Sequence, residues 1–279
     1  MTVPIGLIGA GNVANAHLEA FEARDGLDLA AICEADEERA REVGEAHDVP
    51  VWGDFEAFVT EAPIEAVDVT LPHHLHHPAA KAALEADLHV IVEKPMAVSM
   101  AEARELVDLA ADRDRILMAA QMQRFDPHNR AVRELLDEAA IGPVRHARVD
   151  GIQNLQDYAD PPHWLYDGAS AGGGGIISVL VHKLDLLRYF VGEPARACAL
   201  DRTVNEDFSD ADDYAVGLLE FENGAIVDLF STYSAAAVPY GESFWLFGDD
   251  GVIEAVPGEG EYVTDPRIAR SGGPGAADG

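Results

Sequence analysis

The stretch VPIGLIGAGNVANAHLEAFEA, from Val3 to Ala23, begins with a short apolar run, passes through glycines and ends with apolar residues at helical spacing. This pattern predicts a strand, a tight turn and a helix. Within it, GAGNVA fits the pattern G-x-G-x-x-G/A directly after the strand. Gly9 permits the tight turn, Gly11 lets the backbone approach a pyrophosphate, and Ala14 lets the helix pack closely on the strand. The stretch therefore predicts the start of a dinucleotide-binding domain.

Residues beside this turn predict which dinucleotide binds. Asn12 and Val13 complete the loop that faces the phosphates, and Glu34 stands at the end of the second predicted strand, in LDLAAICEAD. A carboxylate in that place accepts hydrogen bonds from both ribose hydroxyls and repels a 2′-phosphate. Ala35 and Asp36 follow it, so no arginine adjoins the acid and we expect NAD rather than NADP. The alternative is that the glycines only make a turn and that Glu34 is a surface acid.

Predicted strands alternate with predicted helices as far as residue 121, which indicates a parallel sheet covered by helices. Longer β-rich segments follow, and Asn223-Gly224 marks a hairpin turn between two of them. The expected fold class is α/β, with a doubly wound Rossmann domain over residues 1–121. An α+β domain with a large, mainly antiparallel sheet is expected over residues 122–257. Residues 258–279 are rich in glycine and proline, so we expect a disordered tail there.

The composition limits the possible partners. The chain has 279 residues and a formal net charge of −32, from 51 acidic and 19 basic residues. A field of this sign repels nucleic acid and anionic membranes, so neither is an expected partner. The acids are interspersed along a sequence with 48% hydrophobic residues, a pattern that indicates a solvated acidic surface adapted to high salt.

The same sequence indicates a cytoplasmic protein. No apolar run approaches the roughly 20 residues of a membrane helix, and no early segment has the pattern of a signal peptide. Cys33 and Cys198 lie far apart in apolar surroundings and form no metal-ligand pattern. We expect them to be reduced core residues.

Lysine is rare in this chain, in which only Lys81, Lys94 and Lys183 occur. Lys94 belongs to the tripeptide Glu93-Lys94-Pro95, which directly follows the predicted strand HVIV. Ligands of a doubly wound fold bind at the carboxyl ends of its strands. We therefore expect Lys94 to face the nicotinamide pocket.

Several motifs in order resemble those of a known family. They are GAGNVA, LPHHLHHPAAKAALEAD, EKP, RFDP and GGGGIISVLVHKLDLLRYFVGEP. In this order the motifs resemble the Gfo/Idh/MocA family of sugar and polyol dehydrogenases, from the first strand to about residue 256. The resemblance implies an NAD-dependent oxidoreductase that transfers a hydride between NAD and a secondary alcohol of a sugar, cyclitol or similar polyol.

The resemblance also implies two catalytic residues, Lys94 and His182. The family commonly has aspartate four residues before this histidine, where this chain has Ser178, and often glycine two residues before it, where this chain has Leu180. Ser178, His182 and Asp185 fall at i, i+4 and i+7, on one face of a helix. Ser178 and Asp185 are therefore candidates for a relay to the histidine. A purely structural role for Asp185 is the alternative.

Oxidation of a secondary alcohol requires a group that removes the hydroxyl proton. Histidine, with an ordinary pKa of about 6.5, is suited to that task, whereas lysine, at about 10.4, is suited to hold the developing alkoxide as a cation. We therefore expect Lys94 to polarise the substrate hydroxyl and His182 to take its proton. The alternative is that His182 is a structural helix residue and Lys94 a surface charge.

The histidine-rich loop HHLHH, His73 to His77, matches the family's loop over the nicotinamide. A metal site is the alternative, but no carboxylate or cysteine pattern accompanies the four imidazoles, so no metal is expected. The residues that we expect to line the cofactor here are Pro72, His73, His76, Glu93 and Lys94.

Trp164 precedes the glycine run and is a candidate for stacking on a sugar ring, with ordinary packing as the alternative. The candidate substrate residues are thus Lys94, Trp164, Ser178 and His182.

Two other function classes fit the same motifs. Because Ser178 replaces an aspartate, the chain could be a noncatalytic NAD-binding or redox-sensing protein. It could also be an enzyme that keeps NAD bound and uses transient oxidation to cleave or rearrange a sugar. Members of the Gfo/Idh/MocA family commonly associate through the antiparallel sheet. The resemblance therefore implies a homodimer or homotetramer formed through the second domain.

Overall fold

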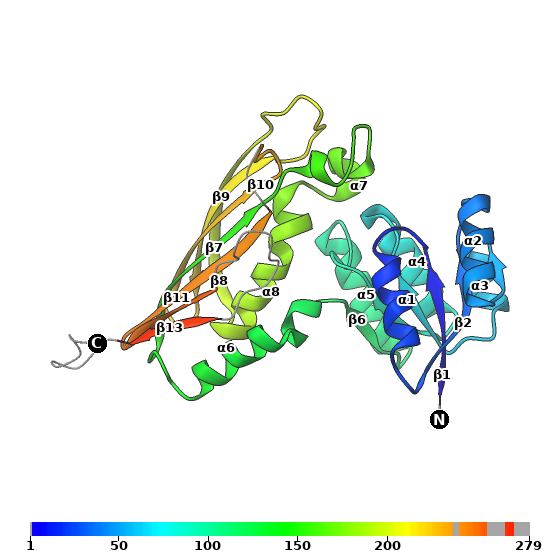
Figure 1. Ribbon diagram of the computed structural model, residues 1–279, viewed down its shortest axis with the longest axis horizontal. Coiled ribbons are helices and arrows are strands. Elements are labelled where there is room, and N and C mark those ends of the chain that lie inside the picture. The colour runs from blue at the N-terminus through cyan, green and yellow to red at the C-terminus, as the bar shows by residue number, and fades with distance from the viewer. Residues whose placement is uncertain (1, 237–239, 256–265, 271–279) are drawn as a thin grey trace. The chain divides into compact units, whose positions relative to one another are not determined.

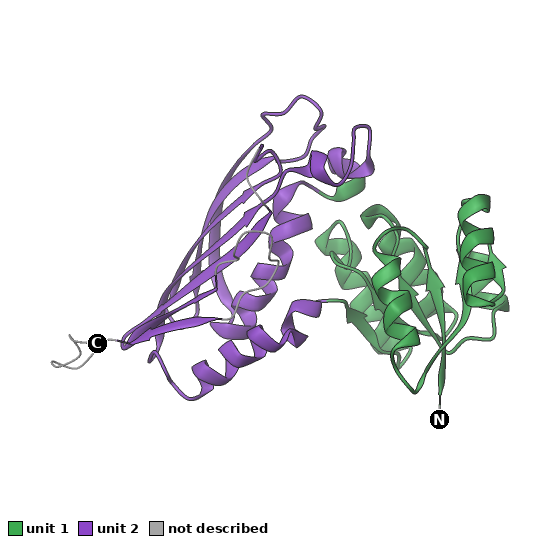
Figure 2. Ribbon diagram, viewed as in Figure 1, with its two compact units in different colours: residues 1–120, 170–172 green, residues 121–169, 173–279 purple. Residues whose placement is uncertain are grey.

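The structure is a computed structural model of the chain, and it describes residues 2–236, 240–255 and 266–270 (Figure 1). The chain forms two compact units (Figure 2). Unit 1 comprises residues 1–120 and 170–172, and unit 2 comprises residues 121–169 and 173–279. We expected residues 170–172 in the second domain, whereas their contacts place them in unit 1. Across the described residues, no helix has the length and apolar character that crossing a membrane requires.

Unit 1 is built on a six-stranded sheet in the order β3-β2-β1-β4-β5-β6, and every neighbouring pair is parallel. This confirms the predicted doubly wound Rossmann sheet. The strand order reverses between β1 and β4, and loops at such a switch point bind the ligands of this fold. The strands are β1 (Val3–Ile8), β2 (Leu27–Cys33), β3 (Val51–Trp52), β4 (Ala66–Val69), β5 (His89–Val92) and β6 (Leu117–Ala119). The helices are α1 (Ala14–Glu22), α2 (Glu37–His47), α3 (Phe55–Glu61), α4 (His73–Glu85) and α5 (Met100–Asp112).

The core of unit 1 follows from the apolar strands. Every residue of β4 is buried, as expected for a central parallel strand, and Leu7 of β1 and Ile32 of β2 are buried beside it. Asp68 is an acid inside this strand, with only 4% of its surface exposed. A carboxylate in such a place requires a charged or hydrogen-bonding partner.

Side-chain caps mark the starts of three helices in unit 1. Asp36 accepts a hydrogen bond from an N–H of the first turn of α2, and Asp54 and Ser99 cap α3 and α5 in the same way. The start of α1 differs, because the preceding residue is Val13 and no side chain caps it. An N-terminus of this kind presents its amide groups to an anion.

Unit 2 is built on a seven-stranded sheet in the order β13-β12-β11-β7-β10-β9-β8. All neighbouring pairs are antiparallel except β7 with β10, which confirms the predicted, mainly antiparallel sheet. The strands are β7 (Val144–Ile152), β8 (Pro194–Arg202), β9 (Tyr214–Phe221), β10 (Ile226–Thr232), β11 (Gly241–Gly248), β12 (Gly251–Ala255) and β13 (Arg267–Arg270). Its longer helices are α6 (Pro127–Asp137) and α8 (Val181–Phe190). The short elements are η1 (Met122–Phe125), η2 (Leu155–Asp157), η3 (Trp164–Tyr166), the π-helix η4 (Ile176–Leu180) and α7 (Gly168–Ala171), whose last two residues belong to unit 1.

Helices α6 and α8 lie along one side of this sheet (Figure 1). The core between the sheet and these two helices is apolar. Leu229 and Leu246 of the strands pack in it with side chains of the helices, which are Val132 of α6 and Leu186 and Phe190 of α8. Because side chains alternate along a strand, the other face of the sheet carries a different set of residues.

The hairpin turn predicted at Asn223-Gly224 is confirmed. Strands β9 and β10 pair antiparallel, and the N–H of Phe221 donates to the carbonyl of Ala225 at 2.9 Å. Gly224 has a φ of +85°, a conformation that glycine adopts without strain.

The structure differs from the expected tail at residues 267–270, which form β13 and pair antiparallel with β12. Ile268 and Ala269 stand between two arginines, and their backbone extends the sheet beyond β12. Backbone pairing with an existing strand stabilises a segment whose composition alone predicts no structure. Residues 258–265 and 271–279 of the expected tail lie outside the described residues.

Candidate active site

The glycine-rich turn after β1 leaves room for a phosphate. Gly9 has a φ of +92°, and a Cβ at this position would lie 2.8 Å from the side chain of Leu71. At Gly11, no heavy atom lies within 4 Å of the place that a Cβ would take. This open side and the uncapped start of α1 fit a pyrophosphate. Gly9, Gly11, Asn12 and Val13 are therefore the residues that could hold it.

Glu34 joins the end of β2 to this turn. One carboxylate oxygen accepts a hydrogen bond from the Ala10 N–H at 2.8 Å, and the other accepts one from the Asp36 N–H at 2.9 Å. The acid thus lies beside the glycine-rich turn, as a residue that recognises a ribose must.

Arg39 also lies beside the glycine-rich turn, and sequence reasoning missed it. Its Nε donates to the carbonyl of Ala10 at 2.8 Å, and Nη2 donates to Asn15 Oδ1 at 3.1 Å. No arginine is adjacent to Glu34 in the sequence, but Arg39 and Glu34 both contact Ala10 in the structure. The first turn of α2 brings residue 39 back to the same residue, Ala10, that Glu34 binds.

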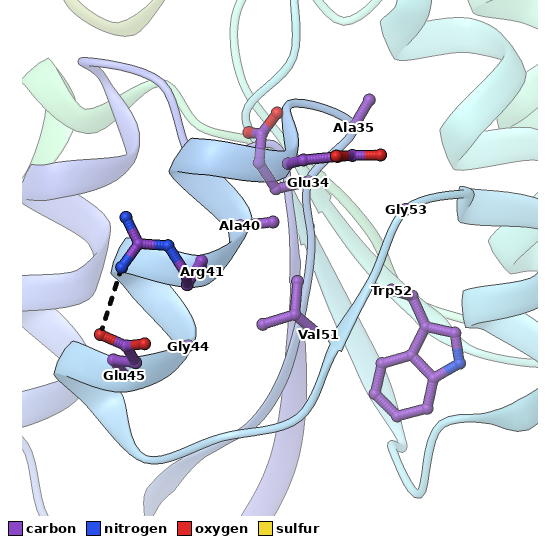
Figure 3. A pocket seen from close by; sticks show the side chains of 10 residues that line it. Glu34, Ala35, Ala40, Arg41, Gly44, Glu45, Val51, Trp52 and Gly53 are labelled. Carbon is purple, nitrogen blue, oxygen red and sulfur yellow. Dashed lines mark ion pairs between the residues drawn. The ribbon is translucent and has the colours of Figure 1, made fainter.

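A pocket of about 510 Å³ opens next to the end of β2 (Figure 3). Its position beyond the carboxyl end of β2 fits the adenosine half of a dinucleotide. Arg41 and Glu45 form an ion pair of 3.7 Å on one side, and the indole of Trp52 lies across from them. The lining residues are Glu34, Ala35, Glu37, Ala40, Arg41, Gly44, Glu45, Val51, Trp52 and Gly53.

Lys94 follows the end of β5, and the side chain of Glu93 holds its backbone. Glu93 Oε2 accepts a hydrogen bond from the Lys94 N–H at 2.9 Å. Burial by itself raises the pKa of Glu93, but a hydrogen bond from His17 and the Lys94 charge hold that pKa below its ordinary value. Glu93 therefore acts as an anion that orders the turn carrying the lysine.

His17, on α1, stands behind Glu93 and was not found from the sequence. Its Nδ1 lies 2.7 Å from Asp68 Oδ2, and its Nε2 lies 3.3 Å from Glu93 Oε1. The hydrogen bonds to Asp68 and Glu93 outweigh the opposing effect of burial and raise the pKa of His17 to about 10. The acid inside the apolar strand β4 was the sequence signal that could have led to this partner.

The histidines predicted to form a loop lie instead in the first turns of α4, where His73 and His76 are buried in unit 1. His76, which is 1% exposed, has Nδ1 at 2.7 Å from the carbonyl of Pro95 and Nε2 at 2.6 Å from that of Leu71. It thus links the loop after β4 to the loop after Lys94. His73 Nδ1 binds the carbonyl of Ala171 at 2.9 Å, and burial lowers the pKa of His73 to about 3, so its imidazole is neutral.

The metal alternative gains no support from the geometry. Among the described residues, no group of three or more histidine, cysteine, aspartate or glutamate side chains is placed to hold a metal ion. His77 instead lies 3.0 Å from Glu105, and burial together with backbone contacts accounts for His73 and His76.

In unit 2, His182 lies near the start of α8 and is 9% exposed. Its Nδ1 is 3.1 Å from Gln121 Oε1. Because an amide oxygen only accepts hydrogen bonds, this contact places the hydrogen on Nδ1 and leaves the lone pair of the neutral ring on Nε2. Gln121 was not predicted as a site residue, since it is 61 positions away in the sequence.

The two relay candidates have other partners. Both oxygens of Asp185 bind Arg124, at 2.6 and 2.7 Å, which agrees with the structural alternative for this acid. Ser178 is buried and interacts with the side chain of Tyr233. Ser178 also lies in the π-helix η4, whereas the predicted face assumed α-helical spacing throughout. A π turn contains an extra residue and changes the phase between positions 178 and 182.

The glycine run before this helix is a tightly packed turn. Gly173 has a φ of +141°, and a Cβ on Gly174 would lie 1.7 Å from the carbonyl oxygen of Asp212. The Asp212 carboxylate accepts hydrogen bonds from the N–H groups of Gly174 at 2.8 Å and Ile176 at 3.3 Å. The run therefore fixes the start of η4, as a linker would not.

Lys183, the neighbour of His182, is held by a buried acid. Its Nζ lies 3.0 Å from Glu242 Oε2 and donates to Gln123 Oε1 at 3.0 Å. Gln123 and the Tyr240 hydroxyl both donate to the same carboxylate. Burial by itself raises the pKa of Glu242, but the nearby ammonium and these hydrogen bonds lower it to about 2. The cluster anchors the first turn of α8, on which His182 lies.

Trp164 lies in η3 with its ring 5.4 Å from that of His163. It is half-buried in unit 2, so the geometry agrees with either packing or stacking on a ligand.

Comparison with known proteins gives the family. Residues 3–121 match the oxidoreductase family with an NAD-binding Rossmann fold, and residues 129–254 match the GFO/IDH/MocA C-terminal domain. Levoglucosan dehydrogenase from Pseudarthrobacter phenanthrenivorans is 27% identical over 281 residues, covering 89% of this chain and 72% of that protein. D-xylose 1-dehydrogenase (NADP(+)) 2 from Haloferax volcanii is 29% identical over 251 residues, covering 86% of this chain and 74% of that protein.

A solved structure of a levoglucosan dehydrogenase in complex with NADH has the same fold. It superposes with a TM-score of 0.86 at 26% identity and covers 98% of this chain and 81% of that chain. Matches of both units to one family, in the order that the sequence motifs indicated, leave one conclusion. The chain belongs to the Gfo/Idh/MocA oxidoreductase family, and its first unit is an NAD-binding Rossmann domain.

Proposed function

We propose that this protein is an NAD-dependent dehydrogenase that acts on a secondary alcohol of a sugar, cyclitol or related polyol. The observation that carries the proposal is Lys94, which follows β5 in an NAD-binding domain with its backbone held by Glu93. The names of two relatives, a levoglucosan dehydrogenase and a D-xylose dehydrogenase, support this substrate class.

The dinucleotide would be held by the glycine-rich turn and by the pocket at the end of β2. Gly11 and the start of α1 would bind the pyrophosphate, and Glu34 would face the adenosine ribose. When bound, NAD supplies the acceptor for the hydride that leaves the alcohol carbon. Pro72 and His73 are proposed to line the cofactor, whereas His76 is proposed to act from behind by ordering the loop at Pro95.

Lys94 and His182 are proposed to act on the same hydroxyl group. Lys94, as a cation, holds the oxygen on which negative charge develops. His182 accepts the proton at Nε2, because Gln121 keeps the other hydrogen at Nδ1. The neutral amide of Gln121 orients the ring without adding a negative charge that would stabilise the imidazolium. In the reverse direction the same imidazolium returns the proton to the alkoxide.

We propose a preference for NAD over NADP because Glu34 carries a negative charge where a 2′-phosphate would lie. Arg39 and Arg41 are near, but each is within ion-pair distance of an acid, Glu42 at 3.4 Å and Glu45 at 3.7 Å. These acids compete for the two guanidinium groups. A kcat/KM for NADP equal to or above that for NAD would contradict this preference.

The test of the function is a panel of polyols and aldoses supplied with NAD at high salt, while NADH absorbance is followed. Steady formation of NADH supports the dehydrogenase. Tightly bound cofactor with sugar rearranged but no net NADH would favour transient oxidation. Bound NAD without turnover of any sugar would favour a redox sensor.

Replacement of Lys94 tests its proposed role in turnover. Lys94→Ala is expected to lower kcat about a hundredfold or more, because the developing alkoxide loses its cation, while NAD still binds. Lys81→Ala is the control, since Lys81 is an exposed lysine paired with Glu105. Unchanged turnover in Lys94→Ala would contradict the assignment.

Four finer proposals accompany the function. We propose that Trp164 contributes a stacking surface for the sugar. A cytoplasmic setting is proposed because Cys33 and Cys198 form no disulfide. Cys33 is buried as expected, whereas Cys198 is exposed, so the expected core position is wrong for Cys198. We also propose a homodimer or homotetramer formed through the unit 2 sheet, in a protein adapted to high salt.

A further inference from the structure

Three elements of unit 1 bring charged side chains together behind Lys94. His17 comes from α1, Asp68 from β4, and Glu93 from the end of β5. The imidazole lies between the two acids, with Nδ1 2.7 Å from Asp68 Oδ2 and Nε2 3.3 Å from Glu93 Oε1. The other oxygen of Glu93 accepts the hydrogen bond from the Lys94 N–H. A continuous chain of polar contacts therefore runs from β4 to the backbone of the lysine.

The geometry requires a charged imidazole. Both ring nitrogens face carboxylate oxygens, and only the doubly protonated ring donates to both. The side chains are 19%, 6% and 11% exposed for His17, Asp68 and Glu93, so the charges interact with little screening by water. Asp68 Oδ1 is buried and has no hydrogen-bond partner among the described residues, so this carboxylate depends on His17.

We propose that His17 is a positioning residue whose imidazolium bridges the Asp68 and Glu93 carboxylates and so fixes Glu93 against the backbone of Lys94. The inference rests on the proposed function in one respect, that Lys94 acts on the substrate. His17 itself touches neither Lys94 nor the reacting atoms in this scheme. It acts by keeping Glu93 ionised and in place.

Loss of the His17 cation is expected to raise the pKa of Glu93. Without His17, burial raises the pKa of Glu93, and Lys94 is the main charge left to oppose that rise. A protonated Glu93 accepts a weaker hydrogen bond from the Lys94 amide. The turn that carries the lysine then becomes less well ordered at the pH where Glu93 takes up a proton.

The variant His17→Gln removes the charge and keeps a side chain that forms hydrogen bonds. We expect kcat to fall roughly tenfold to a hundredfold, as for a misplaced catalytic group, and the acidic limb of its pH profile to move to higher pH. The affinity for NAD is expected to stay that of the unmodified chain. His47→Gln is the matched control, because His47 also contacts a glutamate, Glu22, at 3.3 Å, and its side chain is 19% exposed.

A second measurement does not depend on activity. Imidazole resonances in NMR spectra of the full chain, assigned with His17→Gln, report the protonation of His17 directly. The raised pKa of about 10 predicts that the ring stays protonated from pH 6 to pH 9. The stability that it contributes is fully present below its ordinary pKa of 6.5 and is lost as the pH rises through about 10.

The two results separate the inference from the proposed function. A His17 ring that titrates near pH 6.5 would overturn the inference even if Lys94→Ala abolishes turnover. A His17→Gln variant with wild-type kcat and an unmoved acidic limb would overturn it as well. A protonated bridge in a chain that oxidises no polyol would support the bridge and refute the dehydrogenase.

Discussion

Gln121 orients the ring of His182, which we propose as the base. The residue that would carry a charge, Asp185, is bound to Arg124 through both oxygens, so the contact from Gln121 Oε1 to Nδ1 is the neutral one that orients the ring. A neutral partner orients an imidazole without stabilising its protonated form. This arrangement suits a base that must release its proton again.

Gln121→Glu tests whether Gln121 orients the imidazole of His182 as a neutral partner. A carboxylate next to Nδ1 favours the protonated imidazole, so the acidic limb of the kcat/KM profile is expected to move to higher pH. Gln156→Glu, at an exposed residue of η2, adds the same charge away from the site and is the control. If both variants keep the wild-type profile, Gln121 does not orient the base.

The glycine run decides where the helix with His182 begins. Its glycines are required by close backbone approach, because a Cβ on Gly174 would overlap the carbonyl oxygen of Asp212. The Asp212 carboxylate binds the N–H groups of this same turn and is partly buried, so burial raises its pKa. The turn and the loop at Asp212 therefore form one packed element.

Gly174→Ala is expected to lower the free energy of unfolding by roughly 1–3 kcal/mol or more, because a backbone atom cannot move aside as a flexible side chain can. Gly11→Ala is the control, since no heavy atom lies near its Cβ position. Urea unfolding followed by circular dichroism measures both. We expect Gly11→Ala to keep its stability and to bind NAD more weakly, and equal stability of the two variants would contradict the packed turn.

At the scale of the whole molecule, the outer face of the unit 2 sheet is apolar in part. Val216, Leu218 and Ile226 are each more than half exposed on the adjacent strands β9 and β10, and Leu200 on β8 is 67% exposed. Leu200 and Val216 are cross-strand neighbours, whereas Leu218 and Ile226 lie opposite Asp228 and Glu220. Exposed apolar side chains grouped on one sheet face favour association. It supports the homodimer or homotetramer proposed for this chain.

Val216→Glu tests the association surface. A charge on this face is expected to shift the protein toward the monomer, because burying an unpaired carboxylate in an interface is costly. Val107→Glu on α5 is the control, since Val107 is 52% and Val216 54% exposed. Sedimentation measures the mass of each, and an oligomer that persists in Val216→Glu would rule out this face.

The net charge of −32 makes stability depend on salt. Repulsion among surface acids destabilises the folded chain, and salt screens it, with a Debye length of about 10 Å at 0.1 M and 3 Å at 1 M. The melting temperature is therefore expected to rise from low to molar KCl. A melting temperature that stays constant or falls over that range would contradict the proposed adaptation to high salt.

Much of the fold could be predicted from local sequence, since its signals are periodic. A few neighbouring residues are enough to predict each local conformation. Examples are the alternating strands and helices, the GAGNVA turn and the Asn223-Gly224 hairpin. Strand β13 was missed because four residues between glycines and prolines carry little periodicity, and pairing with β12 stabilises them.

The sequence by itself determined the class of fold, the glycine-rich turn after β1 and the identity of Lys94 and His182 as candidates. The tertiary structure alone decided which side chains serve them: His17 and Asp68 for the lysine turn, and Gln121 for the histidine. Local conformation depends on neighbours along the chain. The charge and orientation of a buried group depend instead on partners 50 to 80 residues away, which only packing brings within hydrogen-bond distance.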